Sequence, residues 1–354
     1  MEEIPFYDDR YKTDDPDEED AYDEELIDDC LLVKENGGGP MEETEETENK
    51  EDRPCVDTSN PLAIYRFLLE RVYKQDRYCR DASMILYDHL RGITSRNIVC
   101  GPAGCGKTYV WECLKEIYPR IITVDVANLT KEGWSGGSKV NDFLEKVEVD
   151  VKDYIVVFDE FDKCATPMYS RHDENVSASI QSEFLKLVEG KVIKSKRAFG
   201  NVTVDTSGMT FVFCGSFAQK AEEIAETATS SGFGFEKERK EGVAFEKELT
   251  PSDLVDFGVI TELVSRCTRL INVRPLTLED YTYLLAEHGG SPLKMLEKKY
   301  GMEFEIPDEK KKEIARNAFE SGLGIRNVSA QIQRMMDDEI FARFVKKEEH
   351  SEPL

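Results

Sequence analysis

Asn97-Ile-Val-Cys-Gly-Pro-Ala-Gly-Cys-Gly-Lys-Thr108 is the stretch from which the fold of this chain can be inferred. Its apolar start predicts a buried strand, and the following run Tyr109–Glu116 predicts a helix. The residues between them fit the phosphate-loop pattern G-x-x-x-x-G-K-[ST] at every fixed position. The loop consists of Gly101, Pro102, Ala103, Gly104, Cys105, Gly106, Lys107 and Thr108.

This pattern predicts a site for ATP and Mg²⁺. The glycines allow backbone N–H groups to point inward around phosphate oxygens, and the start of the helix at Tyr109 adds its positive dipole end. We expect Lys107 to contact the β- and γ-phosphates during catalysis, and the Thr108 hydroxyl to bind Mg²⁺. The alternative is a glycine-rich surface turn.

Acidic residues are concentrated at the start of the chain. Of the formal charge of −26, the first 53 residues carry −18, from 23 Asp and Glu against 5 Lys and Arg. Such a segment buries too little apolar surface to offset its ordering entropy, so residues 1–58 are predicted to be a disordered leader. The alternative is a docking tail in which Tyr22–Val33 folds on a partner.

Other sequence features exclude several classes of protein. There is no run of 18 apolar residues, so no membrane span is expected, and no signal peptide precedes the acidic start. The nine cysteines form no C-x-x-C pair, which favours free thiols in a reducing cytoplasm. The acidic excess makes nucleic acid an unlikely ligand, because phosphate binding needs a basic surface.

Strands and helices alternate through the middle of the chain. Strands are expected near residues 98–100, 120–125, 153–158, 209–214 and 269–273, and helices near 139–147, 178–189, 218–228 and 252–264. This alternation predicts an α/β domain, residues 59–275, with a parallel sheet flanked by helices. Residues 276–348 are predicted to form a small helical domain, followed by a tail at 349–354.

A second chemical motif is Tyr154-Ile-Val-Val-Phe-Asp-Glu160, an apolar strand that ends on two carboxylates. Ligands of open α/β sheets bind at the carboxyl ends of the strands. We therefore expect Asp159 to hold Mg²⁺ and Glu160 to polarise the attacking water. The alternative is an acidic turn after a core strand.

Over about residues 60–345 the chain resembles the ClpX-type AAA+ protein unfoldases. Val157-Phe-Asp-Glu-Phe-Asp-Lys163 is similar to the family's V-x-I-D-E-I-D-K, and Leu129-Thr-Lys-Glu-Gly-Trp-Ser-Gly136 to its pore loop L-T-E-A-G-Y-V-G. Val176–Gly190 and Val204–Ala218 also match in family order. The resemblance implies an ATPase with a helical lid domain that forms a homo-oligomeric ring, a hexamer, and threads polypeptide through its pore.

The resemblance also implies roles for single residues. Trp134 would grip the substrate polypeptide, or else be a buried tryptophan that anchors its loop. Arg266, matching the final arginine of E-D-L-I-K-F-G-L-I-P-E-F-I-G-R, would be an arginine finger that acts on the neighbouring subunit, or else a surface arginine after a helix. Val72 and Tyr73, in a segment similar to V-I-G-Q-E/D, would pack on the adenine, or else belong to a helix core.

The match is imperfect at two places, and the assignment of one further residue is open. Phe233, Gly234 and Phe235 occupy the position of the I-G-F or L-G-F loop that docks on the ClpP peptidase. In Ser321-Gly-Leu-Gly-Ile-Arg326, Leu323 stands where the family has its sensor arginine, and Arg326 could substitute if the helix begins one turn later. The polar sensor at the end of the fourth strand could be Cys214 or Ser216.

Three functions remain open from the sequence. The first is a ClpX-like unfoldase that delivers polypeptide to a ClpP-like peptidase. The second is an AAA+ remodelling factor that works without a protease. The third, which Leu323 favours and Glu160 and Arg266 oppose, is a nucleotide-binding switch with poor turnover.

Overall fold

The computed structural model describes residues 54–127, 129, 139–148, 153–169, 175–197, 200–230, 247–286, 291–321 and 324–349. Residues 51–354 form one compact unit, distinct from residues 1–50. Several predictions therefore lie outside the described residues: nearly all of the leader, Trp134, the Phe233–Phe235 loop, Leu323 and the tail after Glu349.

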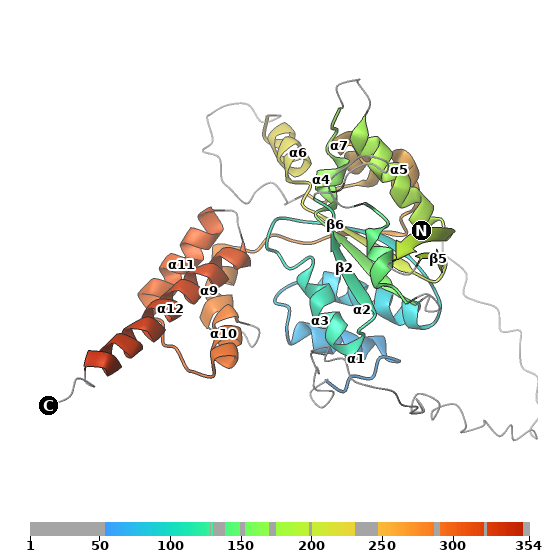
Figure 1. Cartoon of the computed structure of the whole chain (residues 1–354). Coiled ribbons are helices and arrows are strands. Elements are labelled where there is room, and N and C mark those ends of the chain that lie inside the picture. Colours follow the sequence, from blue (N-terminus) through green and yellow to red (C-terminus); the bar gives the residue numbers. More distant parts are fainter. Residues whose placement is uncertain are drawn as a thin grey trace, which may run out of the picture. The chain divides into compact units, whose positions relative to one another are not determined.

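The core element is a five-stranded parallel sheet (Figure 1). Its strands, in the order β2-β3-β6-β1-β7, are β2 (Ile121–Asp125), β3 (Ile155–Asp159), β6 (Thr210–Gly215), β1 (Arg96–Cys100) and β7 (Arg269–Asn272). The predicted α/β class is thus confirmed. Residues 192–205 form a separate antiparallel hairpin of β4 (Val192–Arg197) and β5 (Gly200–Asp205).

Helices cover both faces of this sheet, and strand residues alternate between them. Val99, Val157 and Val212 pack toward α1 (Pro61–Leu69), α2 (Asp76–Leu90) and α3 (Tyr109–Ile117). Ile98, Val156 and Phe211 pack toward the opposite face, which is covered by α5 (Val176–Val188), α7 (Pro251–Phe257) and α8 (Thr261–Arg266). The inner strands β3 and β6 are buried on both faces, and their sequences are accordingly almost uninterrupted apolar runs.

Aromatic rings fill the second of these faces. Phe158 of β3 packs against Phe184 of α5, with ring centroids 4.9 Å apart, and against Phe213 of β6 at 5.3 Å. Phe161, in the short helix α4 (Phe161–Ala165), lies 4.8 Å from Phe213. All four side chains are fully buried, so this aromatic cluster fixes the chain on both sides of residues 159–160.

The prediction of one helix over residues 252–264 is wrong, because the structure has two helices there. α7 begins at a capping box between Thr250 and Asp253 and ends at Gly258, whose φ of +125° stops the helix. α8 then begins at Thr261. The helix predicted over 139–147 is a short 3₁₀ turn, Asp142–Lys146.

The C-terminal part is helical, as predicted, and has its own core. Its helices are α9 (Leu278–Ala286), α10 (Pro292–Tyr300), α11 (Asp308–Glu320) and α12 (Ile325–Glu349), and the remaining helix, α6 (Ala218–Ser230), precedes it in the chain. Tyr281 and Leu285 of α9 pack with Ile332 and Met336 of α12. Within the described residues, no helix combines the length and the apolar composition needed to cross a membrane.

A buried polar group lies at the amino-terminal end of the sheet. The imidazole of His89 is 3% exposed, and its ring nitrogens lie 3.0 Å from the Thr210 hydroxyl and 3.2 Å from the Tyr118 hydroxyl. The Tyr118 hydroxyl in turn donates to the Asp153 carbonyl. Burial lowers the pKa of His89 below its usual 6.5, so the neutral imidazole is the form that fits this site.

The protein should therefore lose stability as the pH falls. Below about pH 6.5 the unfolded chain protonates its histidine while the folded chain does not, so stability declines by up to about 1.4 kcal/mol per pH unit until the folded pKa is reached. Denaturant unfolding of the wild type and of His89→Gln between pH 7.5 and 5.5 measures this. An equal decline in both proteins would contradict the assignment to His89.

Candidate active site

The register of three parallel strands assembles the site. Cys100 of β1 pairs with Gly215 of β6, and Phe158 of β3 pairs with Phe213 of β6. The phosphate loop, the two carboxylates of residues 159–160 and Ser216 therefore emerge at the same edge of the sheet. This is the carboxyl edge, where ligands of open parallel sheets bind.

The phosphate loop is held in place by hydrogen bonds at its end. The Lys107 ammonium donates to the carbonyls of Gly101 at 2.8 Å and Pro102 at 2.7 Å. The buried Tyr78 hydroxyl donates to the Lys107 carbonyl at 2.5 Å. Burial raises the pKa of the Cys105 thiol, so the loop carries no thiolate that would repel a phosphate.

Glu160 has an unusual backbone conformation. Its φ and ψ are +59° and +31°, in the left-handed region that non-glycine residues rarely adopt. Phe158 and Phe161, on either side, are fixed in the aromatic cluster, and the Glu160 N–H donates to the Asp159 carboxylate at 3.0 Å. Strained residues held in this way by their surroundings are common at active sites.

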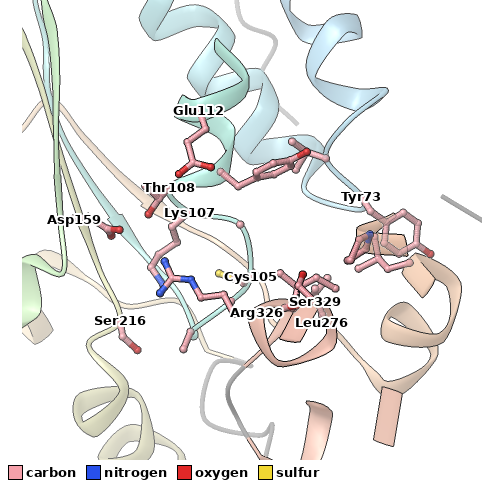
Figure 2. Close-up of a pocket in the computed structure, with 18 of the residues that line it drawn as sticks. Tyr73, Cys105, Lys107, Thr108, Glu112, Asp159, Ser216, Leu276, Arg326 and Ser329 are labelled. Atoms are coloured by element: carbon pink, nitrogen blue, oxygen red, sulfur yellow. Dashed lines mark hydrogen bonds between the residues drawn. The ribbon is translucent and has the colours of Figure 1, made fainter. Parts of the chain in front are cut away.

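These groups line one pocket of about 540 Å³, a size typical of small-molecule sites (Figure 2). Most of the predicted nucleotide-site residues are in its wall: Val72, Tyr73, Ala103, Gly104, Cys105, Gly106, Lys107, Thr108, Tyr109, Asp159, Glu160 and Arg326. Gly101 and Pro102 do not line it, but their carbonyls accept the hydrogen bonds from Lys107. The structure thus brings together residues from 72 to 326 of the chain.

The donor set in this pocket suits Mg²⁺. Figure 2 shows the Thr108 hydroxyl and the Asp159 carboxylate pointing into the same part of the pocket. Both are hard oxygen ligands, which Mg²⁺ prefers, and a site of one or two protein oxygens leaves room for phosphate oxygens and water. The residues present therefore fit the predicted metal.

The helical part contributes a cation to the pocket. Arg326 is the second residue of α12, and in Figure 2 its side chain extends toward Lys107. The backbones of the two parts touch here: a Cβ added to Gly324 would lie 2.5 Å from the Gly104 Cα. Both glycines have φ of +68°, so neither position tolerates a side chain.

Arg266 is separate from this group. It ends α8, does not line the pocket, and is 39% exposed. Its guanidinium donates to the Glu189 carboxylate at 3.0 Å and to the Glu262 carbonyl at 2.8 Å. The Glu189 carboxylate also pairs with Lys191, and these bonds lower the pKa of Glu189.

The pocket wall distinguishes the two sensor candidates and also contains residues to which the sequence assigned no role. Of the two sensor candidates, Ser216 lines the pocket, whereas Cys214 is fully buried among the apolar residues next to α3. Asp162, whose carboxylate accepts from the Ser216 N–H at 3.0 Å, was present in the quoted motif but given no role. Glu112 and Ser329 also contribute to the wall, and nothing in their local sequence distinguishes them.

A family model agrees with the position of this pocket. Residues 97–230 match the model described as "ATPase family associated with various cellular activities (AAA)". The matched range begins one residue after the start of β1 and includes the phosphate loop, β3 and β6.

Whole-chain comparisons find relatives at moderate identity. The chain is 26% identical to the ATP-dependent Clp protease ATP-binding subunit ClpX of Treponema denticola, over 79% of this chain and 76% of the relative. It is 26% identical to the protein of the same name from Porphyromonas gingivalis, over 84% and 80%. It is 28% identical to the mitochondrial ATP-dependent clpX-like chaperone of Saccharomyces cerevisiae, over 68% of this chain and 58% of that protein.

The contact between the glycines can be tested with a matched pair of variants. Gly324→Ala should weaken ATP binding about 10-fold, because the new methyl group pushes the start of α12, and with it Arg326, away from the phosphate loop. Gly301→Ala is the control: its φ is +63°, but nothing lies within 4 Å of the added methyl. Equal ATP affinities of the two variants would show that the contact is unimportant.

Proposed function

We propose that the chain is a ClpX-like AAA+ ATPase and that it is an ATP-driven protein unfoldase that works as a homo-oligomeric ring, a hexamer. The observation that carries this proposal is the division of the catalytic set. One pocket contains Lys107, Asp159 and Glu160, whereas Arg266 is exposed outside it. An exposed arginine at the end of α8 is available to a nucleotide bound by the next subunit.

Within a subunit, each group has a distinct task. Lys107 binds the β- and γ-phosphates, and Thr108 and Asp159 hold Mg²⁺, which when bound neutralises phosphate charge. The Glu160 carboxylate accepts a proton from the attacking water. Ser216 is our choice for the polar sensor, because it lines the pocket and Cys214 does not.

Two arginines supply positive charge to the transferred phosphate. Arg326, which lines the same pocket as Lys107, acts within the subunit and takes the role that Leu323 cannot perform. Arg266 acts on the neighbour, after exchanging its bond to Glu189 for phosphate oxygens. Because both arginines are assigned to the transferred phosphate, a nucleotide switch with poor turnover is the less favoured function.

On the base side of the nucleotide, Val72 and Tyr73 pack against the adenine.

Threading rests on the sequence of the loop that contains Trp134. The aromatic ring of Trp134 is a large apolar group in a sequence that places Gly133 before it and Gly136 after it, and such a ring can push on any polypeptide side chain. The two bacterial relatives, which carry the name ClpX and are described as protease subunits, support this role.

We place the protein in the cytoplasm, although the yeast relative is described as mitochondrial.

Whether a peptidase takes part depends on Phe233-Gly234-Phe235. We propose that this loop docks on a ClpP-like peptidase, since two aromatics in a charged segment have no evident structural reason. The second candidate is a remodelling factor that works without a protease. The departure at Phe233 favours it, as does the description of the yeast relative as a chaperone.

Glu160→Gln tests the catalytic assignment. The amide keeps the size of the side chain but cannot accept the proton, so ATP should still bind while hydrolysis falls by about 10²–10⁴-fold. Nucleotide binding and phosphate release measure the two effects, with Lys107→Ala as the control that loses binding. Substantial hydrolysis by Glu160→Gln would exclude Glu160 as the base. In the ATP-bound state this variant should also retain polypeptide clients for identification.

Trp134→Ala tests threading. ATP hydrolysis should stay close to that of the wild type, whereas unfolding of a client captured by Glu160→Gln should be lost. The rates of ATP turnover and of client unfolding are measured on the same preparation. If the variant unfolds its client normally, the protein does not grip polypeptide through Trp134. If the variant fails to fold, the indole of Trp134 is a structural anchor.

A further inference from the structure

The turn between α1 and α2 contacts the helical C-terminal part. Val72 and Tyr73 line the nucleotide pocket, but the next residue, Lys74, does not. Lys74 has φ of +52°, in the left-handed region, and it stands where the similar family segment V-I-G-Q has glycine. Glycine would adopt this conformation without strain, so the backbone of the turn does not require a lysine.

The lysine side chain has a specific partner. Its ammonium lies 2.5 Å from the Asp280 carboxylate, in the first turn of α9. Asp280 is completely buried, and a buried carboxylate needs a cation or several donors. The Thr277 N–H also donates to this carboxylate at 2.9 Å, and the Arg274 guanidinium forms a longer ion pair with it at 3.6 Å.

These bonds keep the carboxylate ionised. Burial would raise the pKa of Asp280, but the hydrogen bonds from Lys74 and Thr277 outweigh it and lower the pKa. The same pairing raises the pKa of Lys74. Lys74 therefore forms a charged pair across the junction between the turn and α9.

Two further contacts join the same elements. The Gln75 side-chain amide, 4% exposed, donates to the Arg274 carbonyl at 3.0 Å. The Tyr73 ring is stacked on that of Tyr283, with centroids 4.6 Å apart and planes 24° from parallel. Three consecutive residues, 73–75, thus hold the segment 274–283 beside the wall of the pocket.

Fixing α9 also fixes α12. Tyr281, next to Asp280, packs in the same core as Val328 and Ile332 of α12. A helix in a packed core moves with its neighbours, so the position of α9 determines where α12 presents Arg326. A path of packed elements therefore leads from Lys74 through α9 and α12 to Arg326, which lines the same pocket as Lys107.

We propose that Lys74 and Asp280 form a charge clamp that sets the position of the helical domain over the bound nucleotide, with Lys74 as a positioning residue for ATP hydrolysis. The proposal rests on the nucleotide site assigned above and is independent of threading. Lys74 touches no reacting atom. It acts through Asp280 on the placement of Arg326.

Replacement of the lysine tests the clamp in the full-length protein. Lys74→Met removes the charge, Lys74→Gly removes both the charge and the backbone strain, and Lys74→Arg keeps the charge. The first two should lower kcat for ATP about 5- to 20-fold, in the lower part of the range of typical couplings between sites, with a smaller change in ATP affinity because the phosphate loop is intact. Lys74→Arg should restore most of the rate.

Hydrogen exchange gives a readout that a loss of stability would not reproduce. In the wild type, ATP should slow exchange in the peptide covering residues 274–286, and this effect should disappear in Lys74→Met. Asp280→Asn should behave in the same way, and combining it with Lys74→Met should add little. If Asp280→Asn fails to fold, the Lys74 variants still decide the question.

Two controls separate the possible failures. Lys310→Met removes an exposed ion pair to Glu313 at 2.8 Å, elsewhere in the helical part, and should match the wild type. Lys107→Ala should lose ATP binding. Suppose that Lys107→Ala loses ATP binding, but Lys74→Met and Lys74→Gly have the same kcat and the same hydrogen exchange as Lys310→Met. The clamp is then refuted, and the assignment of the nucleotide site is retained. If Lys107→Ala still binds ATP, the nucleotide site is wrong and the clamp falls with it.

Discussion

Parallel pairing of β1, β3 and β6 is the constraint on which the site depends. The register aligns Cys100 with Gly215, the last residues of β1 and β6, and it aligns Phe158, one residue before the end of β3, with Phe213. The residues that follow, Gly101, Asp159 and Ser216, must therefore appear at the same edge. A one-residue slip in any pair would also turn the apolar side chains of that strand to the wrong face, so burial on both faces maintains the register.

The site is completed by a second part of the chain that has its own core. Two of the contacts that join it to the sheet domain are the close approach of Gly104 and Gly324 and the ion pair of Lys74 with the buried Asp280. The first leaves no room for a side chain at either glycine, and the second pairs a cation with a carboxylate that is fully buried. Both contacts lie close to residues that line the nucleotide pocket, so the position of the helical part depends on contacts made at that pocket.

Much of this could be inferred from local patterns. The phosphate loop was evident because its glycines, lysine and threonine occur at fixed spacing within one short continuous segment. The α/β class followed from the alternation of predicted strands and helices along the chain. The split of α7 from α8 at Gly258 was missed, since apolar residues continue at helical spacing through the break and only the positive φ shows it.

The sequence by itself determined the chemistry at the sheet edge: a phosphate loop, two carboxylates after a buried strand, and helices around a parallel sheet. Those features depend on residues close together in the chain, where composition and spacing are informative. Only the tertiary structure decided that Ser216 and not Cys214 faces the pocket, that Arg326 extends toward Lys107, and that Lys74 pairs with Asp280. Each of these depends on which face of an element is turned inward, or on contacts between residues up to about 220 positions apart, and packing fixes both.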